Sequence, residues 1–350
     1  MPTLDIILVN RNSEHRLYDC LSSLARTDRF GFELRSVYVV DDASTDDSID
    51  RVDHLDLPLR ILRNTYHTGY GASCNLAVSE SSSDYLLFLN NDTLLHSNSL
   101  TAPLSYMEQS DHSRVGIVGI QLCDARGVVS RSCARFPTFN GLFGQAFGVD
   151  RLLPSLVLPH LMTEWDHSET REVDQVIGAF TLIRRSTFDR LGGYDERFFV
   201  HMEDVDLALR LSKLGYKNIY LTTARAFHEG GGTFRRFKAE SLFFLFRSKI
   251  QYAFKHFGNF RGLAIALVTA FVEPVSRLVF ALWRNSNDDL KATAKAWGML
   301  WRNLVSITKN AWKSPHNITP PHRPVSTSTP PTIDTPSKAK KIASTEGVGT

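Results

Sequence analysis

Short apolar runs alternate with amphipathic stretches over the first 230 residues of the chain. The runs that we expect to form strands cover residues 4–9, 37–40, 59–62, 85–89, 115–122 and 173–183. Residues 14–25 and 71–79, which lie between them, have the spacing of amphipathic helices. Strands that alternate with helices in this way are typical of α/β folds. The pattern therefore predicts an α/β domain whose mixed, mostly parallel sheet is flanked by helices.

Polar clusters follow three of these predicted strands at the point where each strand ends. They are Asn10-Arg11-Asn12, Asp41-Asp42 and Asn90-Asn91-Asp92. In sheets of this class, ligands bind beyond the carboxyl ends of the strands. One cluster alone could be a solvated loop, but three on one edge predict a polar ligand with several points of contact.

The composition changes from about residue 237 onward. Residues 241–257, 262–283 and 288–309 are apolar and cationic with helical spacing, although none is a clean run of the roughly 20 apolar residues that a membrane span needs. We expect amphipathic helices that either pack on the α/β domain or lie on a membrane surface. The predicted organisation is an α/β domain over residues 1–236, these helices over 237–312, and a disordered Pro, Ser, Thr and Lys tail over 313–350.

Composition narrows the class of function. The chain has 350 residues and a net charge of +3, which excludes a strongly basic nucleic-acid binder. Its four cysteines form no CxxC pair, which favours a reducing compartment over a disulfide framework. The N-terminal residues lack the cationic segment and cleavage site of a signal peptide. We therefore expect a cytoplasmic protein that binds no nucleic acid.

The polar clusters contain candidates for cation and nucleotide binding. Asp92 ends the strongest predicted strand, and Mg²⁺ or Mn²⁺ prefers one or two protein carboxylates with phosphate oxygens and water completing its shell. Asp41 and Asp42 could accept hydrogen bonds from a ribose hydroxyl or a base N–H. Alternatively, Asp42 could cap the helix that follows it. The first strand leads into Asn10 without a GxGxxG sequence, which disfavours a dinucleotide site.

A histidine and two arginines surround a glycine run near the end of the predicted domain. His228 precedes Glu229 and three glycines, and its imidazole could bind the same metal ion as Asp92. Arg235 and Arg236 follow the glycines and could neutralise phosphate. They could equally be surface charges or contacts to anionic lipid.

Adjacent acids begin a predicted helix at residue 203. At 3.6 residues per turn, Asp204 lies about 60° from Leu207 and about 20° from Leu211, the apolar residues of that helix. Asp204 therefore points toward the core, whereas Asp206 points away and can pair with Arg210. Acids favour helix N-termini in any case, which accounts for Glu203 and Asp206 better than for an inward Asp204. An inward carboxylate at the edge of a domain is suited to act as a general base.

With these residues in view, the sequence resembles the family 2 glycosyltransferases of the GT-A fold, and among them the rhamnosyltransferase-like group. The resemblance spans about residues 5–236, and its long block from Val176 to Arg236 is highly specific. The matching stretches, in order, are VNRNSEHRLYDCLSSL, VYVVDDASTDDS, NTYHTGYGASCNLAV, YLLFLNNDT, VIGAFTLIRRSTFDRLGGYDERFFVHMEDVDLALRLSKLGYKNIYL and FHEGGGTFRR.

The resemblance implies a role for each matching position. It makes Asp204 the catalytic base with Glu203 beside it, and gives Asp92 and His228 to a divalent cation, Mg²⁺ or Mn²⁺. Asn stands at position 90, where the fullest form of the motif has Asp, which implies weaker metal binding. The expected donor-binding residues are Asn10, Asp41, Asp42, Asn64, Gly69, Asn75, Asn91 and Arg235.

The implied activity is an inverting glycosyl transfer. A sugar, by resemblance rhamnose, would move from a nucleotide-diphosphate donor such as dTDP-rhamnose or a UDP-sugar to a hydroxyl of a polysaccharide or polyprenyl-linked glycan. The expected location is the inner face of the cell membrane, as a peripheral protein. Two other readings stay open. One is a non-catalytic glycan- or membrane-binding protein on the same fold, and the other is a different nucleotide-sugar enzyme such as a nucleotidyltransferase.

Overall fold

The computed structural model describes residues 1–52, 55–149, 160–230 and 237–313. The chain divides into two units, Met1–Ile318 and Thr319–Thr350, and the description below concerns the first. The tail that we expected to be disordered, residues 313–350, lies outside the described residues apart from Lys313.

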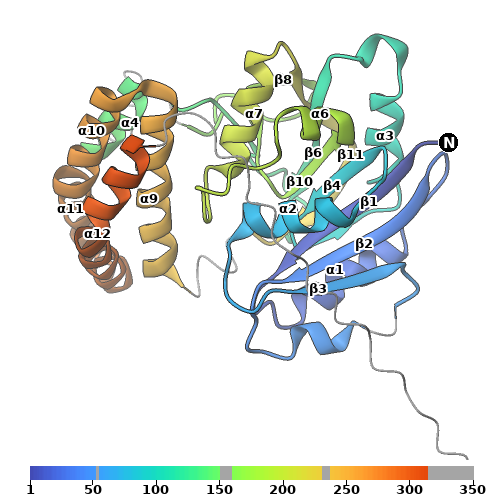
Figure 1. Ribbon diagram of the computed structural model, residues 1–350, viewed down its shortest axis with the longest axis horizontal. Helices are drawn as coiled ribbons and strands as arrows, with labels where there is room; N and C mark the ends of the chain where they lie inside the picture. The colour runs from blue at the N-terminus through green and yellow to red at the C-terminus, as the bar shows by residue number, and fades with distance from the viewer. Residues whose placement is uncertain (53–54, 150–159, 231–236, 314–350) are drawn as a thin grey trace, which may run out of the picture. The chain divides into compact units, whose positions relative to one another are not determined.

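Nine strands of the described residues form one mixed sheet (Figure 1). Along the main path the order is β3-β2-β1-β4-β10-β6-β11-β5, and β8 pairs with β11. Six of the described strands, β3, β2, β1, β4, β6 and β11, run in one direction, and β10, β5 and β8 run in the other. The strands are β1 (Thr3–Asn10), β2 (Glu33–Asp41), β3 (Leu59–Arg63), β4 (Tyr85–Leu89), β5 (Thr93–Leu95), β6 (Val115–Cys123), β8 (Arg171–Val173), β10 (Phe180–Arg184) and β11 (Lys217–His228).

Two hydrophobic layers, one on each face, hold this sheet. In β1, Leu4, Ile6 and Leu8 point into one layer and Ile7 into the other, as the two-residue repeat of a strand requires. Helix α1 (Arg16–Ala25) closes the first layer, and α2 (Tyr70–Glu80) closes the second. The predicted mixed, mostly parallel α/β sheet with flanking helices and a C-terminal helical extension is therefore confirmed.

The apolar run at residues 173–183 is not one strand. It divides into the end of β8, the short β9 (Gln175–Val176) and β10, and β9 pairs with β7 (Cys133–Ala134) outside the main sheet. Asp174 and Gly178 stand between these pieces. Because β10 runs antiparallel to β4, its first residues lie at the edge where β4 ends. This break places a backbone segment directly beside the Asn90–Asp92 cluster.

The C-terminal helices form their own hydrophobic clusters. α9 (Lys238–Phe257) packs with α12 (Asn287–Lys313) and with a long helix composed of α10 (Asn259–Leu267), the π-helix η3 (Val268–Val272) and α11 (Glu273–Trp283). The remaining described helices are η1 (Ser48–Arg51), α3 (Thr101–Met107), η2 (Ser110–His112), α4 (Phe139–Ala146), α6 (Arg185–Arg190) and α7 (Glu203–Lys213).

The helix Asn259–Trp283 is longer than the sequence pattern suggested. It begins three residues before the predicted stretch 262–283 and continues through Glu273-Pro274 for 25 helical residues, because proline is tolerated in the first turn of a helix segment. Among the described residues it is the one helix long and apolar enough to cross a membrane by length and composition, and 33% of its apolar window is buried.

Candidate functional site

The three polar clusters predicted at strand ends lie along one edge of the sheet. Asn10 and Asp41 are paired across β1 and β2, and the Asn10 amide donates to Asp41 Oδ1 at 3.1 Å. The Asn91 amide donates to the Val9 carbonyl at 3.1 Å, which ties the end of β4 to β1. Asn10 also donates to Ser44 and Ser48, so its side chain is completely used within the protein. Asn10 and Asn91 therefore shape this edge through internal hydrogen bonds.

Asp42 is the centre of the most heavily bonded group at this edge. Its buried carboxylate accepts hydrogen bonds from the backbone N–H groups of Thr68 at 2.7 Å and Gly69 at 3.0 Å. His67 Nδ1 lies 2.6 Å from Oδ2, and the Asn64 amide donates to Oδ1 at 3.0 Å. Burial alone would raise the pKa of Asp42, but these hydrogen bonds lower it below its ordinary value. Asp42 is thus an anion that holds the loop 64–69 in place through hydrogen bonds. It does not cap the helix that follows it.

Gly69 is required where that loop enters α2. Its φ of +92° is in the region that favours glycine, and a Cβ there would lie 2.2 Å from the Phe199 carbonyl oxygen. That same carbonyl accepts the Tyr70 N–H at 2.9 Å. Further along α2, the Asn75 side chain donates to the Tyr194 carbonyl and accepts the Tyr194 N–H. Two of the predicted donor-binding residues, Gly69 and Asn75, therefore lie where α2 is attached to the segment 194–199.

Asp92 and His228, 136 positions apart in sequence, are brought together by the sheet. His228 Nε2 lies 3.2 Å from Asp92 Oδ1, and about 12% of each side chain is exposed. The pairing of β5 with β11 produces this contact, because Thr93 is the register partner of His228. Arg16 on α1 forms an ion pair at 2.6 Å with Glu229 and so fixes the same end of β11.

This carboxylate–imidazole pair fits a hard or borderline divalent cation. Both groups are ligands that Mn²⁺ accepts, and one protein carboxylate with substrate phosphates is a common arrangement for Mg²⁺. No group of three His, Cys, Asp or Glu residues with metal-ligand spacing occurs in the described ranges. Asp92 and His228 would thus supply two ligands, and the remainder of the shell would come from the bound substrate and water.

Asp204 lies in the first turn of α7 and is half-buried. Its Oδ2 accepts hydrogen bonds from the Gln175 amide at 2.9 Å and the Gly178 N–H at 3.1 Å. The side chain therefore points toward the β9–β10 connection, but it is less buried than Glu203 and Asp206, which the helical geometry did not predict. Because the neighbouring Ala179 carbonyl accepts the Asn90 N–H at 3.0 Å, residues 178–179 connect Asp204 to the turn that carries Asp92.

Glu203 differs chemically from its neighbour. Its side chain is buried, and Oε2 has no hydrogen-bond partner. Burial, together with the nearby charge of Asp204, raises the pKa of Glu203 to about 8. Burial therefore favours the protonated form of Glu203, and of the two acids Asp204 is the more exposed one.

Asp206 pairs with Arg210 at 2.7 Å, as predicted, but the prediction that it points away from the protein interior was wrong. It is completely buried because α9 covers that side of α7, with Lys255 Nζ at 2.5 Å and His256 Nε2 at 2.8 Å from Oδ1. Burial alone would raise the pKa of Asp206, but His256, Arg210 and Lys255 hold it well below its usual range. This network joins the C-terminal helices to α7.

The residues before α7 are in an uncommon backbone conformation. His201 and Met202 both have φ near +70°, which costs non-glycine residues free energy of order 1–3 kcal/mol each. Ser248 of α9 donates to the Val200 carbonyl at 2.9 Å, and His201 Nε2 lies 3.0 Å from Ser241 Oγ of the same helix. Contacts with α9 therefore hold the turn that places Glu203 and Asp204.

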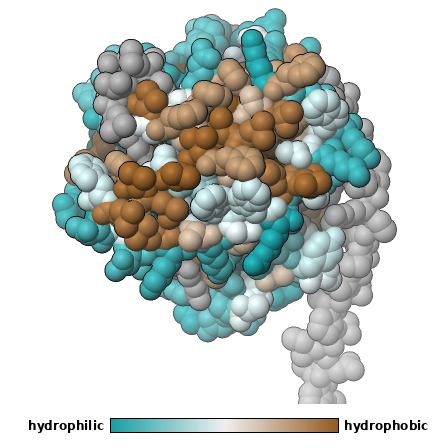
Figure 2. Space-filling view, turned by 90° about the vertical axis from the view of Figure 1, so that its left-hand side faces the viewer, coloured by the Kyte–Doolittle hydropathy of each residue, from teal (hydrophilic) through white to brown (hydrophobic). Residues whose placement is uncertain are grey.

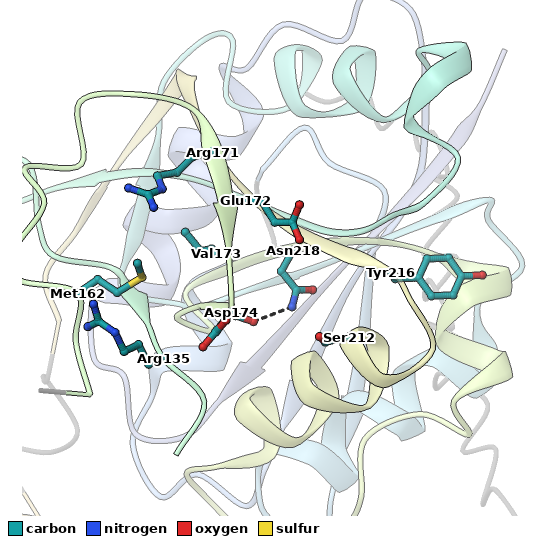
Figure 3. Close-up of a pocket in the computed structure, with 9 residues that line it drawn as sticks. All are labelled: Arg135, Met162, Arg171, Glu172, Val173, Asp174, Ser212, Tyr216 and Asn218. Atoms are coloured by element: carbon teal, nitrogen blue, oxygen red, sulfur yellow. Dashed lines mark hydrogen bonds between the residues drawn. The ribbon is translucent and has the colours of Figure 1, made fainter. Parts of the chain in front are cut away.

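A separate open pocket of about 370 Å³ is lined by residues of β8 and by residues at the end of α7 and the start of β11 (Figure 3). Arg135 and Arg171 line it together with Asp174, whose carbonyl accepts the Asn218 amide at 2.7 Å, and with Tyr216. It contains none of the predicted site residues. The predicted site residues at the strand ends lie instead along the polar edge of the sheet.

The sequence left parts of the site unassigned. His67, Thr68 and Gln175 were not singled out, although the first two stand inside a stretch that carries the family resemblance. Short polar residues just before a glycine are a usable signal for a tight loop, whereas Gln175 lies 29 positions from Asp204 and has no local signal. Arg235 and Arg236 lie outside the described residues.

Comparison with known proteins identifies relatives. The family model described as glycosyl transferase family 2 matches residues 5–192, more than half of the chain. The N-acetylglucosaminyl-diphospho-decaprenol L-rhamnosyltransferase of Mycobacterium tuberculosis is 28% identical over 205 residues, which cover 55% of this chain and 66% of the relative. The rhamnosyltransferase WbbL of Escherichia coli K12 is 27% identical over 192 residues, or 53% of this chain and 69% of the relative. The chain thus spans about two thirds of the length of these curated relatives.

Among solved structures, a mannosyltransferase from Pyrobaculum calidifontis in complex with GDP-Man and Mn²⁺ aligns with 90% of this chain and 87% of its own. The identity is 18% and the TM-score is 0.48. The residues that match the family model run from β1 to just beyond the end of α6. The chain therefore belongs to glycosyl transferase family 2, as the sequence resemblance predicted.

Proposed function

We propose that this protein is an inverting glycosyltransferase that moves a sugar from a nucleotide-diphosphate donor to an acceptor hydroxyl. One observation carries the proposal. The β4–β10 pairing holds residues 178–179 between the Asn90–Asp92 turn and Asp204, so a cation-binding pair and a carboxylate base share one sheet edge. Such a site can bind a diphosphate on one side and take a proton from an attacking hydroxyl on the other.

Asp204 acts as the general base in this proposal. The Gln175 amide and the Gly178 N–H orient its Oδ2, and the side chain stands in the first turn of α7. Asp204 takes the proton of the acceptor hydroxyl as the hydroxyl oxygen bonds to the anomeric carbon and the bond to the diphosphate breaks. A single displacement of this kind inverts the configuration at that carbon. Glu203, which is buried and protonated, supports Asp204 from inside the domain.

Asp92 and His228 would hold a divalent cation, Mg²⁺ or Mn²⁺. When bound, that cation would offset the charge that develops on the leaving diphosphate. The ion pair of Arg16 with Glu229 keeps His228 facing Asp92, so the two ligands need little reorganisation.

The nucleotide would occupy the edge formed by β1, β2 and the loop 64–69. Asp41 is the proposed acceptor for a base or ribose hydrogen bond, while Asp42 acts by fixing the loop at Gly69. Asn10, Asn64, Asn75 and Asn91 are proposed to shape this pocket through their hydrogen bonds within the protein. Arg235 is proposed to contact the phosphates.

The names of the relatives support a rhamnose donor and a lipid-linked acceptor. We propose dTDP-rhamnose or a UDP-sugar as donor and a growing glycan on a polyprenyl carrier as acceptor, in polysaccharide or cell-wall synthesis. The enzyme would work in the cytoplasm at the inner face of the cell membrane, with its residues 237–312 in contact with that membrane and residues 1–236 as the catalytic domain.

A non-catalytic glycan-binding protein on this fold is the second candidate. It would need neither a protonated Glu203 nor a base held by Gln175, so the geometry favours the enzyme. A nucleotidyltransferase is disfavoured because Asn10, the last residue of β1, leads into no glycine-rich basic loop.

A transfer assay tests the proposal. The full chain is incubated with dTDP-rhamnose, UDP-sugars or GDP-sugars, Mn²⁺ or Mg²⁺, and a synthetic polyprenyl-diphosphate glycan, and the product is detected by mass spectrometry. The proposal expects a metal-dependent product in which the anomeric configuration of the donor sugar is inverted. Retention of configuration, or equal turnover in the presence of a chelator, would contradict it.

A further inference from the structure

The C-terminal helices expose an unusually continuous apolar surface. Leu263, Leu267, Phe271, Val275, Val279 and Leu282 are each at least 40% exposed, and Phe260 and Trp283 at the two ends of the same helix are exposed by 87% and 76%. Figure 2 looks onto this side of the helices and shows a broad hydrophobic band. Exposed apolar patches of this kind mark interaction sites.

The π-helix keeps this surface on one side of the helix. An α-helix has about 3.6 residues per turn, so side chains spaced four residues apart shift steadily around the axis of an uninterrupted helix. The one extra residue in the π-turn Val268–Val272 shifts the later positions by one, so that Val275, Val279 and Leu282 continue the line of Leu263 and Leu267. The exposed apolar side chains from Phe260 to Trp283 therefore form one line along the helix, which we call the apolar stripe.

The opposite side of the helix is fastened to the protein. Glu273 is buried and forms ion pairs with Lys249 of α9 and with Arg277 at 3.0 Å. Trp297 of α12 donates its indole N–H to the Ala270 carbonyl at 2.7 Å. A helix with buried ion pairs and polar contacts on one face and an apolar stripe on the other is suited to lie along an interface. It is poorly suited to cross a bilayer surrounded by lipid.

The charge and aromatic content around the stripe match an anionic lipid surface. Residues 259–313 contain eight lysines and arginines against three acids, and the one acid within residues 259–287 is the buried Glu273. Trp283, Trp301 and Trp312 are exposed, and Trp301 is in ring contact with Phe271 of the stripe at 4.7 Å. Tryptophan with flanking cations is characteristic of membrane–water interfaces.

A pocket of about 480 Å³ opens beside the end of the stripe. Lys238, Arg277 and Arg284 line it, and of these Lys238 is paired with Asp289 and Arg277 with Glu273, so Arg284 is the cation that we assign to a headgroup. Arginines at the edge of an apolar surface can bind the phosphate of a lipid headgroup bidentately.

We propose that the apolar stripe, with Trp301 and the adjacent cations, docks this protein in the plane of an anionic bilayer without crossing it. The inference deepens the proposed function, because it states how an enzyme that acts on a lipid-linked acceptor is held at the membrane. It does not depend on catalysis, since docking needs neither donor nor acceptor.

Vesicle flotation of the full chain tests the proposal. We expect binding to phosphatidylcholine vesicles that contain phosphatidylglycerol, weaker binding without it, and release by an alkaline carbonate wash. The double variant Val275→Glu/Val279→Glu should lower partitioning by about tenfold or more. The matched control Phe30→Glu/Val128→Glu, at apolar residues that are 90% and 60% exposed elsewhere, should bind as the wild type does. Arg284→Gln/Arg302→Gln should weaken binding only where phosphatidylglycerol is present.

Several results would overturn the proposal. The first is that the full chain binds no vesicles, and the second is that both glutamate double variants lose vesicle binding equally. The third is binding that resists the carbonate wash, which would mean a spanning helix. A concentration-dependent dimer of the wild type, seen by sedimentation and abolished by Val275→Glu/Val279→Glu, would assign the stripe to a second copy of this chain. Nucleotide binding measured in the same variants is expected to be unchanged, which separates a failure of docking from a failure of the proposed function.

Discussion

Glu203 and Asp204 are neighbours in sequence with opposite environments. Asp204 is half-buried and accepts three hydrogen bonds, whereas Glu203 is buried with one oxygen unpartnered. A site that needs one base near a diphosphate benefits from this difference, because a second anion would repel the leaving group. Pairs of acids whose environments differ in this way are common in enzymes that separate acid from base roles.

Replacing the proposed base should remove activity but not structure. Asp204→Asn keeps an oxygen able to accept from Gln175 or Gly178 but cannot take a proton, so we expect turnover to fall by about 10²–10⁴-fold in the transfer assay. Asp189→Asn, at an exposed carboxylate paired with Arg185, is the control and should retain activity. Near-full turnover of Asp204→Asn with an unchanged melting temperature would refute the assignment.

Glu203 should make stability depend on pH. Its pKa is raised to about 8 in the folded protein from an ordinary value of 4.5, so the folded state binds the proton more tightly. Its contribution to stability is therefore fully present below about pH 4.5 and is lost as the pH rises toward 8 and above. Urea unfolding across this range should show the wild type losing stability relative to Glu203→Gln as the pH rises. A constant or opposite difference between the two proteins would contradict the assignment.

At the scale of single residues, the sequence predicted which side chains could carry chemistry better than it predicted their contacts in the fold. Asp92 and His228 were predicted as a pair on chemical grounds, and the β5–β11 pairing brings them into contact. The five hydrogen bonds to Asp42 and the burial of Asp206 under α9 could not be predicted, because both arise from packing between distant elements.

At the scale of elements, the loop 64–69 and the segment 194–202 act as a joint between sheet and helices. Phe199 is central to it: its carbonyl accepts the Tyr70 N–H, and its ring contacts His67 at 4.4 Å and Phe244 of α9 at 4.7 Å. The donor side of the site, the turn before α7 and the C-terminal helices therefore meet at one aromatic side chain.

A methyl group at Gly69 should disturb this joint. Gly69→Ala must accommodate both a positive φ and a contact with the Phe199 carbonyl, whereas Gly31→Ala has a similar φ of +87° with no atom within 4 Å of the new Cβ. We expect Gly69→Ala to lower the free energy of unfolding by about 1–3 kcal/mol more than Gly31→Ala, because the added contact must be relieved by backbone movement. Equal losses in urea unfolding would show that the close approach to Phe199 is not important.

The Asp206 network should be a main attachment of α9 to α7. Asp206→Ala leaves Arg210 and His256 without their buried carboxylate, whereas Lys255 keeps Asp195 at 2.6 Å, and we expect a loss of about 3–5 kcal/mol. Asp189→Ala removes an exposed pair with Arg185 and should cost about 1 kcal/mol or less. Hydrogen exchange would check the location, because amides of α9 should lose protection in Asp206→Ala before those of β1. Equal stability of the two variants would contradict a structural role for the network.

The accuracy of the element predictions followed the strength of the local pattern. Residues 85–89 form β4 with the predicted bounds because the run is apolar throughout and is bounded by Asp84 and Asn90. Residues 173–183 were predicted as one strand but form parts of three, because Asp174 and Gly178 interrupt the pairing and β9 pairs with β7 instead. Apolar content alone could not distinguish these two cases.

At the scale of the whole molecule, the described chain combines a polar sheet edge with an apolar helical surface. We propose that the first binds a sugar nucleotide and a cation, and that the second contacts a membrane. The C-terminal helices also hold the turn before Asp204 through Ser248 and Ser241. Removing them should therefore impair the site as well as membrane docking.

A thermal-shift comparison of nucleoside diphosphates tests the central claim most directly, since a ligand that binds only the native state raises its melting temperature. The account predicts that dTDP or UDP with Mn²⁺ stabilises the wild type, that neither nucleotide nor metal does so alone, and that the effect is lost in Asp92→Ala and His228→Ala. If no nucleoside diphosphate shifts the melting temperature with either metal, or if both variants respond as the wild type does, the sheet edge is not a sugar-nucleotide site.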